Sequence, residues 1–234
     1  MPNANLLLAS LSESDSKLIR PHLKPELFEQ QRILFEAGNN VSQVYFPTTA
    51  IVSLVATLTN GSVVEAAMVG RDGVVGAAAA LDGKLSLSRG IIQIAGKMMV
   101  CELEALRSAA MQSQTFLAIL IRHEQTVYAQ AQQSAACIAS HVVEARLSRW
   151  MLRARDLAAT DTLMFTQEFL GEMMGVSRPT VSTVAHLLQR AGLIKYSRGK
   201  IQIIDLEGLR ETSCECYGTI RDHYRALLGK YPEV

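Results

Sequence analysis

The sequence of 234 residues has no long hydrophobic run, and this absence excludes a membrane-spanning helix. Its longest apolar stretches, residues 74–81 and 116–121, are far shorter than the roughly 18 residues that a bilayer crossing needs. Residues 1–5 also lack the basic start and apolar stretch of a signal peptide. Hydrophobic residues make up 49% and charged residues 19%, which excludes a disordered chain. We therefore expect a globular cytoplasmic protein that does not bind membranes.

Cysteine and histidine are scarce. The 4 cysteines are too few and too scattered for a disulfide framework, and they do not form the two pairs of a metal site. We expect Cys101 and Cys137 to be buried as small hydrophobic residues, while redox sensing by Cys214 or Cys216 stays open. Residues 26–100 contain no histidine, which removes the ligands of a cupin-type metalloenzyme. The sequence predicts neither an enzyme nor a metal or other cofactor.

Acidic residues are absent from residues 174–204. The same stretch holds five basic residues: Arg178, Arg190, Lys195, Arg198 and Lys200. The whole chain has a net charge of only +1, so this basic stretch is a local feature. A surface that faces phosphates needs such a stretch, because a nearby carboxylate would repel them. Chance clustering on a solvated face is the alternative that charge alone leaves open.

The secondary structure that the sequence predicts changes along the chain. Residues 1–24 have leucines and isoleucines near helical spacing, and Pro21 and Pro25 end this run. From residue 26 to about 101, short β-rich runs (44–46, 51–55 and 91–94 among them) alternate with turn signals. The turn signals are residues 38–40, 60–61, 70–73, 82–83 and 96. This pattern predicts an antiparallel sandwich, jelly roll or barrel.

Residues 113–156 contain no Gly or Pro and are rich in good helix formers, which predicts a long helix. Apolar and small residues step along it by sevens, fours and threes, as in a coiled-coil seam. This seam consists of Leu117, Ile121, Tyr128, Ala131, Ala135 and Ile138. Small residues, including Ser134, would permit close approach of a twin helix. We interpret the seam as a homodimer interface; a helix lying on its own barrel is the alternative.

A helix-turn-helix signature lies between Gln167 and His186. The motif needs a small residue where its helices cross and a turn residue that tolerates a left-handed backbone. Gly171 and Gly175 occupy these two places. The buried apolar places are occupied by Leu170, Met174, Val176, Val181 and Val184.

The second helix of the motif is predicted over residues 178–191, with Ser177 as its cap and Pro179 in its first turn. The side chains predicted to point inward are Val181, Val184, Leu187 and Leu188. The side chains predicted on the exposed face are Arg178, Pro179, Ser182, Thr183 and His186. Two strands, residues 193–196 and 200–204, follow Gly192 and form the hairpin of a winged helix. The alternative function for such a domain is to dock a protein partner.

The order of a small β-domain, a long helix and a winged helix resembles the Crp/Fnr superfamily of bacterial transcription regulators. The motif from Thr166 to Gly171 and the motif from Gly175 to Val181 carry the resemblance. It implies an α+β fold with three parts: a cyclic-nucleotide-binding-like sensor domain (1–110), a dimerisation helix (111–140) and a winged helix with a helical tail (141–234). It further implies a homodimer that binds double-stranded DNA, with RNA polymerase as a partner.

The resemblance also implies roles for single residues. Thr166, Ser177 and Thr180 match positions that hold DNA phosphates, and Arg178 matches an arginine that reads guanine. Where cyclic-AMP-responsive members have Glu and Arg, this chain has Pro179 and Thr183. The complete predicted DNA surface is Thr166, Gln167, Ser177, Arg178, Pro179, Thr180, Ser182, Thr183, His186, Arg198 and Lys200. We therefore do not expect this chain to recognise the operator sequence of those members.

The same resemblance places a weak effector pocket at Gly76, Ala77, Leu87, Ser88 and Arg89. The family's cassette uses a Glu for the ribose and an Arg and a Ser for the cyclic phosphate. Here Ala77 and Leu87 stand at the Glu and Arg positions, and neither can make those hydrogen bonds. Arg89 could substitute only if the loop shifted by two residues. We expect no cyclic-AMP binding of the usual kind, and the effector stays unknown.

Overall fold

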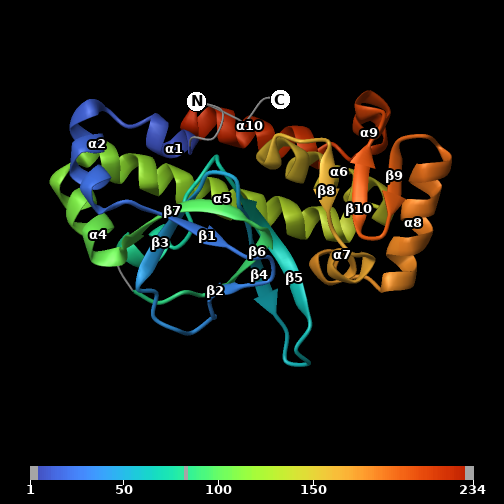
Figure 1. Ribbon diagram of the computed structural model, residues 1–234, viewed down its shortest axis with the longest axis horizontal. Coiled ribbons are helices and arrows are strands. Elements are labelled where there is room, and N and C mark those ends of the chain that lie inside the picture. The colour runs from blue at the N-terminus through green and yellow to red at the C-terminus, as the bar shows by residue number, and fades with distance from the viewer. Residues whose placement is uncertain (1–4, 82–83, 230–234) are drawn as a thin grey trace.

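The computed structural model describes residues 5–81 and 84–229 and is drawn in Figure 1. Residues 1–4 and the turn expected at residues 82–83 lie outside the described residues. In the part of the chain that is described, no helix is long and apolar enough to cross a membrane.

Two antiparallel sheets form the N-terminal half, as the alternation of β-rich runs and turns predicted. The strands are β1 (Lys24–Phe28), β2 (Ile33–Phe35), β3 (Gln43–Pro47), β4 (Ile51–Thr57), β5 (Val63–Val69), β6 (Arg89–Ile94) and β7 (Gly96–Glu102). Hydrogen bonds join them in the orders β1-β7-β3 and β2-β6-β4-β5. These strands therefore make two separate sheets in the described residues.

The four-stranded sheet is buried on both faces, and this position connects the two halves of the molecule. Val52 and Val69 point into the core between the sheets. Ile51 and Met68, whose side chains point the opposite way, belong to a second core with the C-terminal half. The run of apolar residues in β4 and β5 thus reflects burial on two sides rather than on one.

Short helices cover the N-terminal sheets at one end of the molecule (Figure 1). They are α1 (Leu6–Ala9), α2 (Glu13–Ile19), the 3-10 helix Arg20–His22, α3 (Ala77–Leu81) and α4 (Leu103–Gln112). Ser12 begins α2 by accepting a hydrogen bond from the amide of Asp15 at 3.1 Å. Pro25 lies inside β1 rather than in a turn.

The long helix predicted over residues 113–156 is two helices, α5 (Gln114–Ser140) and α6 (Val143–Ala158). His141 and Val142 have extended backbones between them, with ψ angles of 144° and 154°. Histidine and β-branched valines are weak helix formers, which favours a break at this junction. The sequence reasoning relied on the absence of Gly and Pro and therefore missed it.

The C-terminal half is a winged helix followed by two helices. Its elements are β8 (Thr162–Met164), α7 (Gln167–Met174), α8 (Arg178–Arg190), β9 (Ile194–Ser197), β10 (Lys200–Ile203), α9 (Leu206–Thr212) and α10 (Cys216–Leu228). The sheet order is β8-β10-β9. The predicted hairpin is present, whereas the three-residue strand β8 was not expected. Helix α10 returns to pack along α5 (Figure 1).

Buried polar contacts join the two halves. Arg153 of α6 forms an ion pair with Asp72 at 2.6 Å, and both side chains are buried. Glu65 of β5 accepts hydrogen bonds from Trp150 of α6 at 2.9 Å and from Ser53 at 2.5 Å. Burial raises the pKa of Glu65 to about 7, against the hydrogen bonds from Ser53 and Trp150, which favour the charged form. This carboxyl group thus titrates near neutral pH at the contact between the four-stranded sheet and α6.

Candidate nucleic-acid interface

The crossing of α7 and α8 has the geometry that the two glycines predicted. Gly175 ends α7 in the left-handed conformation, with φ at 64°. A Cβ atom at Gly171 would lie 2.8 Å from the carbonyl oxygen of Val176, so only glycine permits this close approach. The predicted apolar residues Leu170, Met174 and Val181 are buried. The two helices are therefore held at a fixed angle.

The first turn of α8 is capped by Ser177 and exposed to solvent. The Ser177 hydroxyl accepts a hydrogen bond from the amide of Thr180 at 3.3 Å, and their hydroxyl groups lie 2.8 Å apart. Pro179 lies in the first turn, where it interrupts no helical hydrogen bond. The side chains predicted to be exposed on this helix are exposed: Arg178, Pro179, Ser182, Thr183 and His186. Thr180 is half-buried.

One prediction for α8 was wrong. Leu187 was expected to point inward but is 45% exposed, and Ala185 is buried in its place. The buried stripe follows Val181, Val184 and Leu188, and Leu187 lies at its edge. A stripe with spacings of three and four residues leaves the residue beside it outside the core.

The wing lies next to the start of α7. Arg198 and Gly199 connect its strands with positive φ angles of 49° and 76°, as a two-residue hairpin turn requires. The Tyr196 hydroxyl donates to the carbonyl of Phe165 at 2.9 Å, and the Tyr196 amide donates to Gln189 of α8 at 2.8 Å. Burial raises the pKa of Tyr196, which keeps its hydroxyl group protonated as a donor. The wing is thereby attached to α8 and to the segment that leads into α7.

A polar cleft opens where α7, α8 and the wing meet. Its volume is about 430 Å³, and it is lined by Thr166, Gln167, Glu168, Arg178, Tyr196, Ser197, Arg198 and Gly199. Thr166 both lines the cleft and caps α7 by accepting from the amide of Phe169 at 3.1 Å. Two predicted cations and the amino end of α7 thus face one space of a size that could hold a phosphate group.

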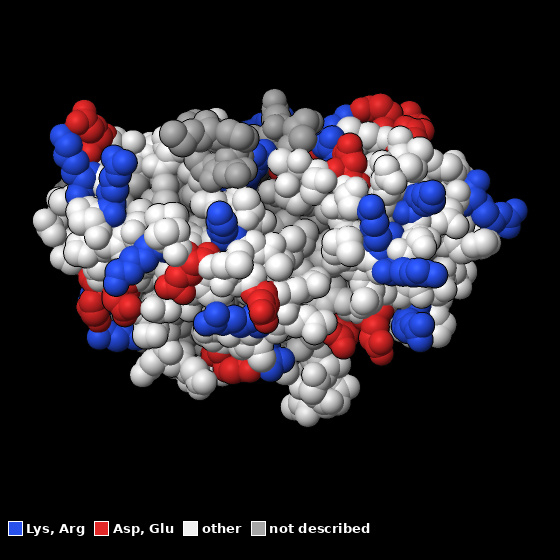
Figure 2. Space-filling view, in the orientation of Figure 1, with Lys and Arg blue, Asp and Glu red and all other residues white. Residues whose placement is uncertain are grey.

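Basic side chains gather around this cleft. Figure 2 shows them at the right-hand end of the molecule, over α8 and the wing. Arg178, Arg198 and Lys200 are all exposed. Glu168 is an acidic residue of the cleft lining, just outside the acid-free stretch. The basic side chains predicted from the sequence are therefore exposed on both the second helix and the wing.

The predicted seam of α5 is left open on a single chain. Ile121, Tyr128, Ala135 and Ile138 are exposed, with Tyr128 at 66%, while Leu117 and Ala131 are half-buried. The opposite face of α5 packs on its own chain through Phe116, Leu120, His123, Thr126, Gln130, Ser134 and Cys137. Ser134 therefore cannot help a twin helix approach, contrary to the expectation. The seam itself is an unpartnered apolar strip.

The predicted effector residues do not all line one space. A cavity of about 560 Å³ between the sheets and α5 is bordered by Gly76, Leu87 and Ser88. Ala77 is buried outside the cavity lining, and Leu87 is 89% exposed. Arg89 forms an ion pair with Glu36 at 2.7 Å instead of pointing into the cavity. The other lining residues are Phe35, Val41, Leu54, Ala66, Ala67, Val74, Ala78, Ala79, Leu85, Ser86, Glu124, Val127, Tyr128 and Ala131.

Comparisons with known proteins agree with this geometry. Residues 145–212 match the Crp-like helix-turn-helix domain. No curated protein matches the chain. Among solved structures, FixK2 from Bradyrhizobium japonicum is 16% identical, with 82% of this chain and 98% of that chain covered and a TM-score of 0.69.

Two proteins of Thermus thermophilus are similar in the same way. TTHB099, a CRP-family transcriptional regulator, is 19% identical over 89% of this chain and 98% of that chain, with a TM-score of 0.67. TTHA1359, a CRP/FNR-family transcriptional regulator, is 21% identical over 81% of this chain and 98% of that chain, with a TM-score of 0.65. The chain has the fold of the Crp/Fnr transcription regulators. Its winged helix falls within the match to the Crp-like helix-turn-helix domain, as the resemblance implied.

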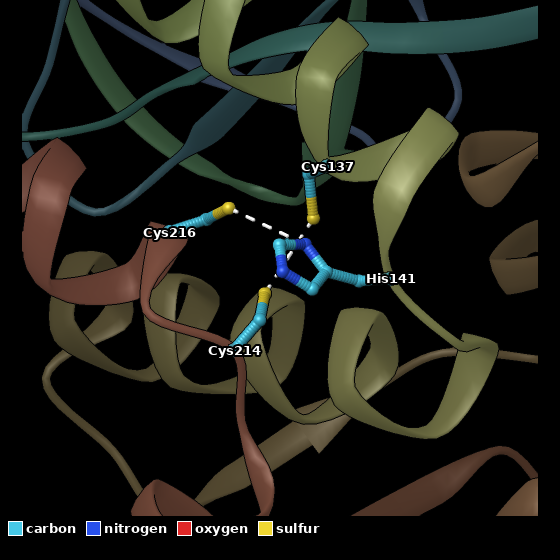
Figure 3. Close-up of side chains that lie close together, drawn as sticks. All are labelled: Cys137, His141, Cys214 and Cys216. Atoms are coloured by element: carbon cyan, nitrogen blue, oxygen red, sulfur yellow. Dashed lines mark hydrogen bonds between the residues drawn. The ribbon is translucent and has the colours of Figure 1, made fainter.

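Sequence reasoning missed one cluster of side chains. Cys137, His141, Cys214 and Cys216 come together at the junction of α5 and α6 (Figure 3). The cysteines were taken as scattered because Cys137 and Cys214 are 77 positions apart in the sequence. Only the short spacings from Cys137 to His141 and from Cys214 to Cys216 could have indicated it. Cys101 is buried among the N-terminal helices and sheets, as expected.

Proposed function

We propose that this protein is a sequence-specific transcription regulator that binds double-stranded DNA as a homodimer in the bacterial cytoplasm. The observation that carries the proposal is the exposed first half of α8 beside a basic wing, in a Crp-like helix-turn-helix domain. In such domains the second helix enters the major groove. We expect RNA polymerase to be its partner at promoters, and no enzymatic activity.

The residues of the proposed interface divide into two groups. Arg178 projects from the amino end of α8, so we assign it to the edge of a guanine, where an arginine can donate two hydrogen bonds. Pro179, Ser182, Thr183 and His186 are the neighbours that contact the same groove. The Thr183 hydroxyl donates to the carbonyl of Pro179 at 3.1 Å, which leaves its methyl group for a thymine methyl.

The second group holds the DNA backbone. Thr166, Gln167, Ser177 and Thr180 surround the amino ends of α7 and α8, where free amides and the helix dipole favour anions. Arg198 and Lys200 of the wing add positive charge on the adjacent side. Contacts of this kind position a protein on DNA without reading its sequence.

The homodimer is proposed on the exposed seam of α5, within a dimerisation helix at residues 111–140. It separates a sensor domain (1–110) from the DNA-binding part (141–234). An apolar strip of this length, exposed on a helix whose buried face packs against its own chain, is accounted for by a second copy that covers it. Two winged helices related by a two-fold axis would then read an inverted repeat.

The effector proposed for the sensor domain is a small, mostly apolar molecule. The cavity beside α5 is lined largely by Ala, Val, Leu and Phe side chains, and it borders Tyr128 and Ala131 of the seam. Among the described residues no arginine lines it, since Arg89 is paired with Glu36. A ligand there would contact the proposed dimer helix directly, which is a route from effector to DNA binding.

Binding to duplex DNA at several salt concentrations tests the central proposal against the alternative of a protein-docking winged helix. We expect random-sequence duplex to bind at low salt, with log K falling by roughly 0.9 per phosphate contact for each unit of log salt. Fluorescence anisotropy of a labelled duplex measures this. Absence of DNA binding at low salt by a folded dimer would favour the protein-docking function.

A further inference from the structure

Four side chains that can ligate a metal meet at the junction between α5 and α6. Cys137 lies in the last turn of α5 and His141 caps its carboxyl end. Cys214 and Cys216 come from the segment between α9 and α10. Figure 3 shows the three sulfur atoms converging on the imidazole ring from these different elements. The cluster is separate from the DNA surface and from the cavity beside α5.

The spacing of the ligand atoms matches one tetrahedral ion. All four atoms lie within 4.8 Å of one another. Cys137 Sγ is 3.5 Å from Cys214 Sγ, and Cys216 Sγ is 3.6 Å from His141 Nδ1. Zinc–sulfur bonds of about 2.3 Å at tetrahedral angles put ligands about 3.8 Å apart. An ion therefore fits with only small side-chain adjustments.

The surroundings orient the ligands as metal sites require. His141 Nε2 lies 3.2 Å from the Glu215 carboxylate, so its proton is held there and the Nδ1 lone pair faces the sulfurs. Gln133 donates a hydrogen bond to Cys216 Sγ at 3.0 Å. Arg149 places a positive charge within electrostatic range of Cys137 and Cys214, which offsets the net negative charge of Zn²⁺ with three thiolates.

We propose that Cys137, His141, Cys214 and Cys216 form a site for one structural Zn²⁺ ion. The three cysteines are buried, and the imidazole is partly exposed, so the ion has a path of entry. Three sulfurs and one nitrogen in a tetrahedral arrangement are a zinc donor set. A disulfide between Cys137 and Cys214 would use two of the four groups and leave the positions of His141 and Cys216 unexplained.

The ion would fasten the tail of the chain to the junction where the DNA-binding part begins. Cys137 and His141 end α5, and α6 starts two residues later at Val143. Cys214 and Cys216 begin the segment that packs back along α5. Zinc bound here would fix the direction in which α6 leaves α5, and removal of the ion would release that constraint.

Titration of the reduced, metal-free, full-length protein with Co²⁺ alone tests the site. We expect one Co²⁺ per chain, with the d–d absorption of a tetrahedral ion and thiolate-to-cobalt charge-transfer bands, and full displacement by one equivalent of Zn²⁺. This readout does not involve DNA, so its outcome is independent of the proposed regulator function. Wild-type protein that binds no stoichiometric Co²⁺ would overturn the proposal, as would a Cys137–Cys214 disulfide in metal-free protein as purified.

Variants distinguish this site from adventitious binding. Cys101→Ser removes a buried thiol elsewhere and should leave the cobalt spectrum unchanged, whereas Cys214→Ser and His141→Ala should abolish stoichiometric binding. Glu215→Gln changes an exposed side chain that is not a ligand, so folding should be preserved while affinity falls about 10–100-fold. Equal affinity of the wild type and Glu215→Gln, or loss of binding in Cys101→Ser alone, would contradict the assignment.

Discussion

Arg178 is placed by its immediate neighbours. Ser177 caps α8 on one side, and Pro179 fixes the first turn on the other. The guanidinium is exposed and close enough to Tyr196 of the wing to act on its hydroxyl electrostatically. Among the exposed residues of the first two turns of α8, it is the one cation. Recognition of a guanine is therefore assigned to a single residue.

Arg178→Ala should weaken operator binding by about 1–3 kcal/mol per half-site and relax the preference at one base pair. The loss should be base-specific, because an arginine that reads guanine donates to both O6 and N7 of that base. Binding to a library of single-base operator variants measures it. A uniform loss across the library would instead assign Arg178 to the phosphate backbone.

Substitutions of other exposed basic residues, Arg198, Lys200 and Arg190, show whether the change in base preference is specific to Arg178. Arg198→Ala, on the wing, should weaken all sequences alike and flatten the salt slope by roughly one unit per half-site; Lys200→Ala should do the same. Arg190→Ala removes the same charge from the last turn of α8, away from the cleft, and should leave base preference unchanged.

Local residue patterns were sufficient to predict the helix-turn-helix but not the whole molecule. Gly171, Gly175 and Ser177 lie within one short motif, so their spacing alone specifies the helices and turn. The cluster of Cys137, His141, Cys214 and Cys216 forms only because the chain from α6 to α9 folds back and brings Cys214 close to Cys137. No local spacing in the sequence indicates this contact. The break at His141 likewise depends on weak propensities that competed with a strong helical pattern.

At the scale of elements, the sides of α5 have different surroundings. One packs on its own chain, and another carries the exposed seam. Helical geometry places Ala131 and Ala135 on the seam, while Ala118 and Ala136 are exposed on a third side, away from both faces. The same kind of substitution can therefore be made on and off the proposed interface.

Placing Glu at both Ala131 and Ala135 should split the dimer, because like charges would be buried where two helices meet. Analytical ultracentrifugation at micromolar concentration measures the assembly state. The control pair, Ala118→Glu with Ala136→Glu, should remain dimeric. If the seam variant sediments as a dimer, the interface lies elsewhere.

Contact between β5 and α6 should depend on pH through Glu65. Its pKa is about 7 in the folded chain, against 4.5 ordinarily. Between these values the unfolded state loses this proton while the folded state keeps it, so the free energy of unfolding falls as pH rises from about 4.5 to 7. Glu65→Gln keeps the hydrogen-bond acceptor and should remove this part of the pH dependence. Denaturant titrations at pH 5 and 8 check it, and identical pH profiles of both proteins would contradict it.

At the scale of the whole molecule, the seam of α5 lies between the cavity beside this helix and the winged helix. The cavity shares Tyr128 and Ala131 with the seam, and the seam ends where α6 leads into the winged helix. Sequence reasoning named Gly76, Leu87 and Ser88 of the cavity lining but not the other residues that line it. Ala77 and Arg89 were predicted near the pocket but do not line the cavity. Ala77 is buried at the start of α3, and Arg89 is held in its ion pair with Glu36.

Millimolar cyclic AMP should neither raise the melting temperature nor strengthen DNA binding, because the described cavity lining offers no arginine for the cyclic phosphate. A small apolar ligand at 100 times its Kd should stabilise the fold by about 2.7 kcal/mol, which a thermal-shift screen detects. Ala66→Leu, which adds bulk to the cavity wall, should abolish that stabilisation. Saturable calorimetric binding of cyclic AMP at micromolar Kd would contradict this prediction.

Selection of bound duplexes from a random-sequence pool tests the central claim most directly. The account predicts enrichment of an inverted repeat whose half-site centres lie about 34–36 Å apart, roughly one helical turn, with a guanine in each half-site that loses its enrichment with Arg178→Ala. A folded protein that enriches no sequence over the starting pool at low salt, or one that enriches only a motif without two-fold symmetry, would contradict it.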